Sequence, residues 1–190
     1  MYKAKDISCL ILAAGSASRF GSAKLLYCLK DGRSILQNTI GVYQSVFDQV
    51  TVVCNDNMQL IDQAHNLGAL IEVNPLAHLG MSESIKLGVR VTQASTAWLI
   101  VLADMPYVDA VSIVRLCQFA DRKKIIQPYF NSSPGNPVMI GTAFLPQLMS
   151  LEGDVGAKAI LKTHSQALIK LDLDDSGLVH DIDTLDDVKS

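Results

Sequence analysis

The feature that most constrains the fold is a mostly apolar run of eight residues, Ile7 to Ala14, that ends abruptly in a loop of small residues. Its length matches one buried strand. Gly15 and Gly21 bracket the loop, and its charged residues, Arg19 and Lys24, are both positive. Glycine lets a backbone approach a ligand closely, and free N–H groups at such a turn bind anions. The pattern predicts a polyphosphate-binding loop; a plain strand-to-helix turn with solvated basic residues is the alternative.

Two common phosphate-binding motifs are excluded by their spacing. A P-loop has four residues between its glycines and a lysine directly after the second. Here five residues separate Gly15 from Gly21, and Lys24 follows three positions later. The dinucleotide fingerprint G-x-G-x-x-G needs its second glycine where Ala17 stands.

Residues 12–24 read L-A-A-G-S-A-S-R-F-G-S-A-K. This string resembles the L-A-A-G-x-[SG]-x-R-x-G-x-x-K loop of nucleotidyltransferases with the MobA-like fold. The continuation Lys24-Leu25-Leu26 is similar to that of the molybdenum-cofactor cytidylyltransferase branch. Ala17 departs from the usual Ser or Gly, a mild change where the backbone N–H makes the contact. By this resemblance Arg19 and Lys24 are catalytic and hold the triphosphate, and the backbone passes close to the nucleotide at Leu12, Ala13, Ala14 and Gly15.

Composition limits the class of protein. The chain has 190 residues, 49% hydrophobic and 18% charged, which favours a single folded domain over residues 1–190. A net charge of −3 argues against nucleic acid as the main partner, and no apolar stretch approaches the roughly 18 residues that cross a bilayer. The four cysteines are scattered without a C-x-x-C pair, which favours reduced thiols in the cytoplasm over disulfides or a zinc site.

Strand and helix patterns alternate along the rest of the chain. Strands are expected at 7–14, 50–54, 69–73, 97–103, 125–127, 138–140 and 167–171, and helices at 35–47, 57–67, 82–93 and 109–120. Ser34 is the expected cap of the first helix. The alternation implies βαβ units. We therefore expect a three-layer, Rossmann-like α/β fold with a mostly parallel central sheet, one antiparallel strand near Val138, and a site at the carboxyl ends of the strands.

The segment 74–88 begins N-P and continues to G-M-S-E-S-I-K-L-G. Ser82 is a plausible N-cap, so a capped helix start without further function is one reading. The order N-P-x-x-x-x-G-M-x-x-S-[IL]-x-x-G is also similar to the segment with which MobA-like nucleotidyltransferases hold the base and ribose. By that resemblance Gly80 and Ser84 face the nucleotide.

A candidate metal site combines Asp104 with the acidic tail. Asp104 ends the apolar strand at 97–103, where a metal or substrate binds in open α/β sheets. Alternatively, it caps a helix starting near Asp109 or pairs with Arg19. The L-x-D-x-P string resembles the family's Mg²⁺ motif, and D-I-D-T-x-x-D-[LV] at the C-terminus is similar to the family's ending. The resemblance implies Asp104 and Asp183 as metal ligands, with Asp181 as the runner-up.

Two further motifs resemble the acceptor side of the family's site. Gly135-Asn136-Pro137 is similar to G-[NH]-P, although on physical grounds it is a turn-rich surface loop. The segment 153–158 resembles G-D-x-G-A-[RK], which opens a helix. Asp154 is equally an ordinary N-cap candidate.

Together the six motifs, in this order from Leu10 to Val188, imply a cytidylyltransferase of molybdenum-cofactor biosynthesis. Such an enzyme transfers CMP from Mg²⁺-bound CTP to the phosphate of the molybdopterin cofactor and releases pyrophosphate. Guanylyl or other nucleotidyl transfer on the same fold is one alternative, with GTP in place of CTP. The other is a non-catalytic carrier that delivers the cofactor to a molybdenum hydroxylase.

Overall fold

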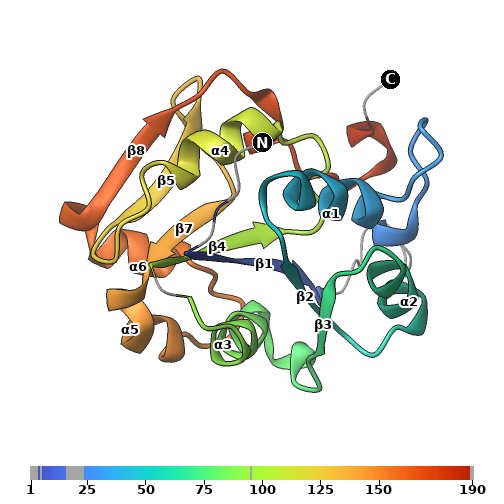
Figure 1. Ribbon diagram of the computed structural model, residues 1–190, viewed down its shortest axis with the longest axis horizontal. Helices are drawn as coiled ribbons and strands as arrows, with labels where there is room; N and C mark the ends of the chain where they lie inside the picture. Colours follow the sequence, from blue (N-terminus) through green and yellow to red (C-terminus); the bar gives the residue numbers. More distant parts are fainter. Residues whose placement is uncertain (1–3, 5, 16–23, 95, 189–190) are drawn as a thin grey trace.

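The computed structural model describes residues 4, 6–15, 24–94 and 96–188, and these form a three-layer α/β structure (Figure 1). Eight described strands make one sheet in the order β3-β2-β1-β4-β7-β5-β6, with β8 paired to β5. The strands are β1 Ile7–Ala13, β2 Val50–Cys54, β3 Leu70–Val73, β4 Ala97–Leu102, β5 Ile125–Phe130, β6 Ser133–Pro134, β7 Val138–Gly141 and β8 Leu168–Asp172.

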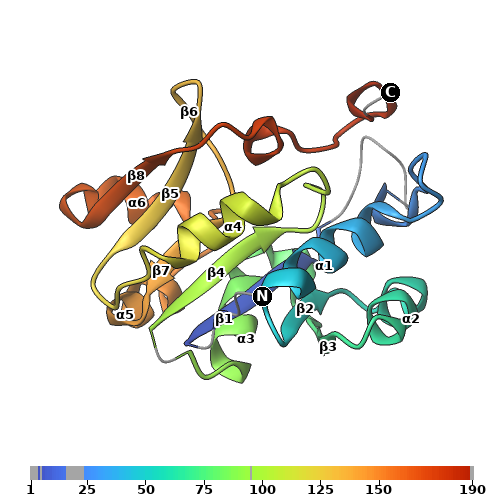
Figure 2. The ribbon, with the colours of Figure 1, turned by 45° about the horizontal axis from the view of Figure 1, so that its top comes forward.

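Helices cover both faces of this sheet (Figures 1 and 2). One face packs against α1 Ile35–Val46, α2 Met58–Asn66 and α4 Ala110–Cys117, around core residues such as Ile11, Ile40 and Ile113. The other face packs against α3 Met81–Val91, α5 Leu145–Met149 and α6 Lys158–Thr163, around Leu10 and Ile85. Alternate residues of β1 therefore enter opposite cores, as expected for a strand buried on both faces.

The centre of the sheet is parallel, as expected. Strand β1 pairs in parallel with β2 and with β4, and β2 pairs in parallel with β3. Their carboxyl ends lie at one edge, where the chain leaves β1 at Ala13 and leaves β4 just before Asp104. This arrangement places residues from distant parts of the sequence at a common rim.

The expected antiparallel strand near Val138 is also confirmed. It is divided into two short strands, β6 and β7. Strand β7 pairs antiparallel with β4 and with β5, and the two-residue β6 pairs antiparallel with the far end of β5. Between β6 and β7 lies Gly135-Asn136-Pro137, with a cis peptide bond before Pro137. The expected end of β5 before Pro128 is wrong, because β5 continues through Pro128 to Phe130.

Helix starts agree with the sequence in one case and differ in another. Ser34 caps α1 in a capping box with Gln37, as expected. The expected cap Ser82 is wrong: the cap position of α3 is Gly80, and Ser82 is buried inside the first turn. No described helix combines the length and apolar character needed to span a bilayer.

Candidate functional site

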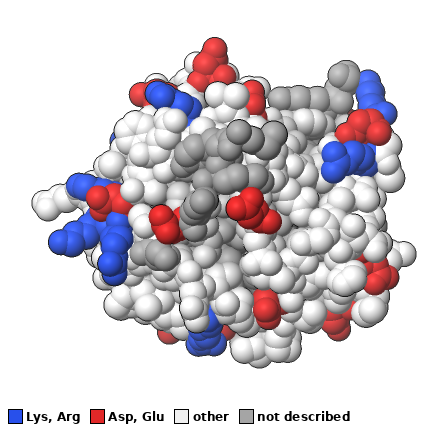
Figure 3. Space-filling model, viewed as in Figure 1, with Lys and Arg blue, Asp and Glu red and all other residues white. Residues whose placement is uncertain are grey.

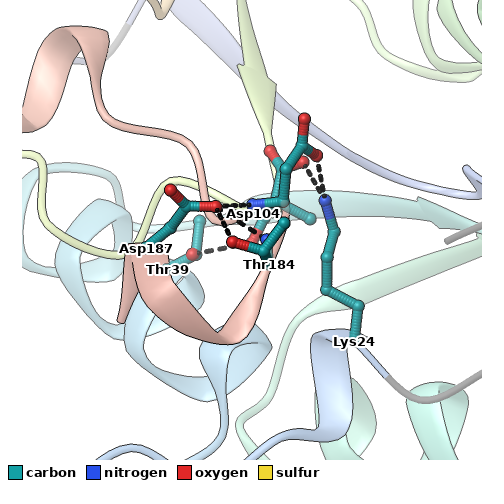
Figure 4. Close-up of polar contacts among 7 residues, drawn as sticks. Lys24, Thr39, Asp104, Thr184 and Asp187 are labelled. Carbon is teal, nitrogen blue, oxygen red and sulfur yellow. Dashed lines mark hydrogen bonds and ion pairs between the residues drawn. The ribbon is translucent and has the colours of Figure 1, made fainter. Parts of the chain in front are cut away.

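The candidate site centres on the ammonium of Lys24, which two carboxylates share (Figure 4). Lys24 Nζ lies 2.8 Å from Asp104 Oδ2 and 3.1 Å from Asp183 Oδ1. The Lys24 side chain is only 11% exposed, whereas those of Asp104 and Asp183 are 23% and 50% exposed. These residues lie 80 and 159 positions from Lys24, so the fold alone brings them together. The alternative role of Asp104 as a helix cap is not observed, because Asp109 caps α4 itself. The alternative pairing with Arg19 falls on a residue outside those that the structure describes.

Two hydrogen bonds fix the chain where it reaches Asp104. The hydroxyl of Thr39 on α1, which is fully buried, donates to the carbonyl of Ala103 at 2.9 Å as well as to Ile35 O at 3.1 Å. The amide of Ala103 donates to Leu12 O at 3.1 Å. The residue before Asp104 is therefore tied both to β1 and to α1.

The C-terminal segment places Asp183 beside Asp104. In Figures 1 and 2 this segment runs from β8 across the molecule toward the chain near Lys24. The amide of Ile182 donates to Asp104 O at 3.0 Å, and Ile182 is fully buried. Asp181 is exposed. Of these two aspartates, Asp183 is the one that contacts Lys24.

Charge and burial act together on Lys24. Burial by itself lowers the pKa of Lys24, but hydrogen bonds and negative charge from Asp104 and then from Asp183 outweigh this, so the pKa is raised above its ordinary value. Its ammonium is therefore charged throughout the neutral range. The pKa of Asp187 in the same segment is lowered, chiefly by the Thr184 hydroxyl and backbone that donate to it.

The donor set fits a hard divalent cation. Asp104 Oδ1 is buried and has no hydrogen-bond partner among the described residues, while Oδ2 holds Lys24. Mg²⁺ typically takes one or two protein carboxylates and fills its other positions with water and substrate phosphate. No cluster of three or more His, Cys, Asp or Glu ligands occurs among the described residues.

The predicted phosphate loop is described only in part. Leu12, Ala13 and Ala14 are buried at the end of β1, and a Cβ on Gly15 would meet no atom of the described residues within 4 Å. Arg19 lies outside the described residues.

The residues predicted to hold base and ribose lie at the start of α3. Gly80 has φ +115°, and a Cβ on it would lie 2.3 Å from the carbonyl carbon of Gly153 and 2.7 Å from Asp154 N. The Ser82 amide donates to Gly153 O at 3.1 Å. The segment 80–84 therefore packs directly against residues 153–154. Ser84 is buried, and its hydroxyl accepts a hydrogen bond from Asn74 Nδ2 at 3.0 Å.

The predicted acceptor residues have different surroundings. Asp154 is exposed and does not cap α6, whose cap position is Ala157. Gly135 is buried against Leu178, since a Cβ would meet Leu178 O at 2.5 Å. Asn136 N donates to that same carbonyl at 2.8 Å, and Pro137 is buried. Residues 135–137 therefore hold the C-terminal segment against β5.

Sequence reasoning missed two polar side chains that position the site, Thr39 and Asp187. A signal existed for each. Thr39 lies three residues after Leu36 on the buried stripe of α1. Thr184 and Asp187 have the spacing of a capping box, which the structure forms around η6 (Leu185–Asp187).

Surface charge is mixed on the face drawn in Figure 3. The described acidic and basic side chains there lie in small separate groups rather than in one broad basic patch.

The comparison with family models matches residues 9–168 to the MobA-like NTP transferase domain. This range includes most of β1, Lys24 and Asp104, and it ends before the C-terminal segment that carries Asp183. Over 194 aligned residues the chain is 25% identical to nicotine blue oxidoreductase of Paenarthrobacter nicotinovorans, covering 95% of both proteins.

Solved structures share the fold. Rv0371c of Mycobacterium tuberculosis H37Rv superposes with a TM-score of 0.82 at 23% identity, over 97% of this chain and 96% of the other. A manganese complex of Rv0371c gives 0.77 at 23% identity over 96% of each chain. A nucleotidyl transferase of Methanothermobacter thermautotroptrophicus gives 0.82 at 19% identity, over 95% and 93%.

Proposed function

This chain belongs to the MobA-like NTP transferase domain family, and we propose that within this family of nucleotidyltransferases it transfers CMP from CTP to the phosphate of the molybdopterin cofactor, releasing pyrophosphate. The observation that carries the proposal is the Lys24 ammonium held between Asp104 and Asp183 at the carboxyl ends of the central strands. The scattered cysteines favour the cytoplasm as the compartment.

The proposed transfer needs positively charged side chains that align the two phosphate groups, and it does not need a protein nucleophile. An oxygen of the acceptor phosphate attacks the α-phosphorus of CTP, a new P–O bond forms, and the bond from that phosphorus to the bridging oxygen breaks. The electron pair leaves with pyrophosphate. Two anions must meet and negative charge grows on the leaving group, so fixed positive charge and alignment supply the catalysis. Lys24, together with Arg19, is the group that we assign to the triphosphate.

Asp104 and Asp183 are the residues that would hold Mg²⁺. Asp104 Oδ1, which has no hydrogen-bond partner among the described residues, supports this assignment, and Rv0371c, which has a similar fold, has been solved as a complex with manganese. When bound, the cation would neutralise charge on the phosphates as the reaction proceeds. Lys24 keeps the two carboxylates close to each other, because its ammonium compensates their mutual repulsion.

The remaining predicted residues complete the proposed binding surface. The backbone of Leu12, Ala13, Ala14 and Gly15 would approach the nucleotide, and Gly80 with Ser84 would lie on the base and ribose side. Gly135, Asn136, Pro137 and Asp154 would lie on the acceptor side. The contact of Gly80 with Gly153 supports a continuous rim from the nucleotide side to the acceptor side.

The experiment is to measure pyrophosphate release from CTP, GTP and ATP with Mg²⁺, with and without molybdenum cofactor. Cofactor-dependent release from CTP alone is the expected result. Preference for GTP would move the protein to guanylyl transfer. Cofactor binding without release from any nucleotide would favour a carrier for a molybdenum hydroxylase. The name of the P. nicotinovorans relative describes an oxidoreductase. Oxidoreduction by this chain without nucleotide consumption would contradict the proposal.

The variant Asp104→Asn should reduce pyrophosphate release by at least about 10²-fold, because it removes a charge at the site of transition-state stabilisation. Its circular dichroism and urea midpoint should show a folded protein. Asp62→Asn, on the exposed side of α2, is the matched control and should act like the wild type. Activity of Asp104→Asn within threefold of the control would exclude Asp104 from the reaction.

A further inference from the structure

One carboxylate oxygen of Asp187 accepts hydrogen bonds from the backbone of Asp183 and from Thr184. Asp187 Oδ2 accepts hydrogen bonds from Thr184 N at 2.7 Å, Thr184 Oγ1 at 2.8 Å and Asp183 N at 3.0 Å (Figure 4). A charged acceptor strengthens each of these hydrogen bonds relative to a neutral one. The three donors fix the chain direction at Asp183 from its C-terminal side.

On the N-terminal side, a separate contact fixes the same residue. Ile182 is buried and its amide donates to the carbonyl of Asp104, so the position of the C-terminal segment relative to Asp104 is fixed. The Asp183 carboxylate itself is half exposed, and its contact with Lys24 is longer than that of Asp104. Its orientation thus depends strongly on the backbone that carries it.

The end of the segment is itself anchored. His180 Nε2 donates to the backbone carbonyl of Asp187, and the His180 ring packs edge to face on Tyr107 with centroids 5.3 Å apart. Residues 180–187 therefore form a closed loop, with Asp183 at the point where it meets Lys24. The neighbouring Asp186 is exposed and has no hydrogen bond or ion pair to another described residue.

We propose that Asp187 is a positioning residue, which acts through the backbone of Asp183 to hold the Asp183 carboxylate beside Asp104 in the geometry that a divalent cation requires. The catalytic consequence rests on the proposed function; the positioning itself does not. Residues that orient ligands from behind typically contribute 10- to 100-fold to metal affinity or activity. Asp187 is not expected to touch the cation or the nucleotide.

The test compares Asp187→Ala with the matched control Asp186→Ala, which removes the same charge one residue away, and with Asp187→Asn, which keeps one acceptor oxygen. The first readout is amide hydrogen exchange at Asp183 and Thr184. We expect at least about tenfold faster exchange in Asp187→Ala, because its amides lose hydrogen bonds to a charged acceptor, no change in Asp186→Ala, and an intermediate rate in Asp187→Asn. Exchange that is equal in the two alanine variants would overturn the inference.

The second readout is Mn²⁺ binding in the presence of CTP, followed by electron paramagnetic resonance, which does not need turnover. Asp187→Ala should bind Mn²⁺ about tenfold more weakly than Asp186→Ala, with partial recovery in Asp187→Asn. Faster amide exchange with unchanged Mn²⁺ affinity would make the contact purely structural and overturn the positioning role. If the wild type binds Mn²⁺ but releases no pyrophosphate, the proposed function fails while the positioning inference stands on the affinity difference.

Discussion

At the scale of single residues, the site depends on polar atoms that have few substitutes. Lys24 supplies the ammonium that lies between two carboxylates, and Thr39 supplies the hydroxyl that holds the backbone before Asp104. A buried carbonyl that loses its donor is left unsatisfied, and this costs more free energy than the hydrogen bond contributed. Thr39 therefore offers a test of how the fold fixes the site without any change of charge.

Thr39→Val should lower the free energy of unfolding by about 1–3 kcal/mol, because valine keeps the shape and leaves the buried Ala103 carbonyl without its donor. Urea denaturation measures the change. The control is Thr163→Val, which removes an exposed hydroxyl that also donates within its own helix. Equal losses in the two variants would mean that the Thr39–Ala103 hydrogen bond adds nothing specific.

At the scale of elements, the start of α3 and the loop at 153–154 depend on their close contact. Gly80 combines a positive φ with a backbone approach that leaves no room for a side chain. Only glycine meets both conditions without strain. The two motifs therefore hold each other in place, and a substitution at Gly80 should separate them.

Gly80→Ala is expected to lower the free energy of unfolding by about 3 kcal/mol or more. The cost of a positive φ in alanine adds to the cost of the clash between its Cβ and the 153–154 backbone. Gly68→Ala is the matched control: Gly68 has φ +73° but open space around it, so only the backbone term applies, about 1–2 kcal/mol. Chemical denaturation measures the free energy of unfolding of both variants. A Gly80→Ala loss no larger than that of Gly68→Ala would contradict the close packing.

At the scale of the whole molecule, three buried thiols, Cys9, Cys54 and Cys117, report on one of the two cores, which lies between the sheet and helices α1, α2 and α4. Burial raises the pKa of Cys54 to about 11 and that of Cys117 to about 12; burial and then the neighbouring Cys117 raise the pKa of Cys9 well above its ordinary value. Cys28 is exposed. The thiolate is the reactive form, so the buried thiols are protected both sterically and by protonation.

A disulfide reagent such as DTNB should modify Cys28 alone in the native protein at pH 8, and all four cysteines after denaturation. In Cys28→Ser the native protein should show no fast-reacting thiol. Rapid labelling of a second cysteine in the native state would show that the core between the sheet and helices α1, α2 and α4 opens far more readily than its burial implies.

The same thiols set a pH dependence of stability. Above pH about 9 the unfolded chain loses thiol protons that the folded chain retains, so the folded state binds more protons and stability falls as pH rises, by about 1.4 kcal/mol per pH unit for each such thiol. Lys24 acts in the same direction: its raised pKa stabilises the fold fully below its ordinary value and ceases to do so as pH rises through the folded value. Urea midpoints at pH 8 and pH 10 measure the fall that the thiols cause, because the Lys24 contribution is lost only at higher pH.

The sequence by itself determined what depends on local pattern. The apolar run at 7–14 predicted β1, Ser34 predicted the start of α1, and the alternation of strands with helices predicted a mostly parallel three-layer fold. Lys24 and Asp104 were identified by their loops, which each occupy a few consecutive residues. Such features depend on residues within about one turn of helix or one strand, so they can be predicted without knowledge of tertiary contacts.

Tertiary structure alone decided how these pieces meet. Pro128 reads as a strand end, yet β5 continues through it because the interrupted return strand, β6 and β7, does not need its missing N–H there. Gly80 replaced Ser82 as the cap because the 153–154 loop packs against it. The choice of Asp183 over Asp181 beside Lys24 depends on Ile182 and Asp187, whose hydrogen bonds orient the segment. Contacts between residues 80 to 159 positions apart depend on the packing of the whole sheet, which no local pattern encodes.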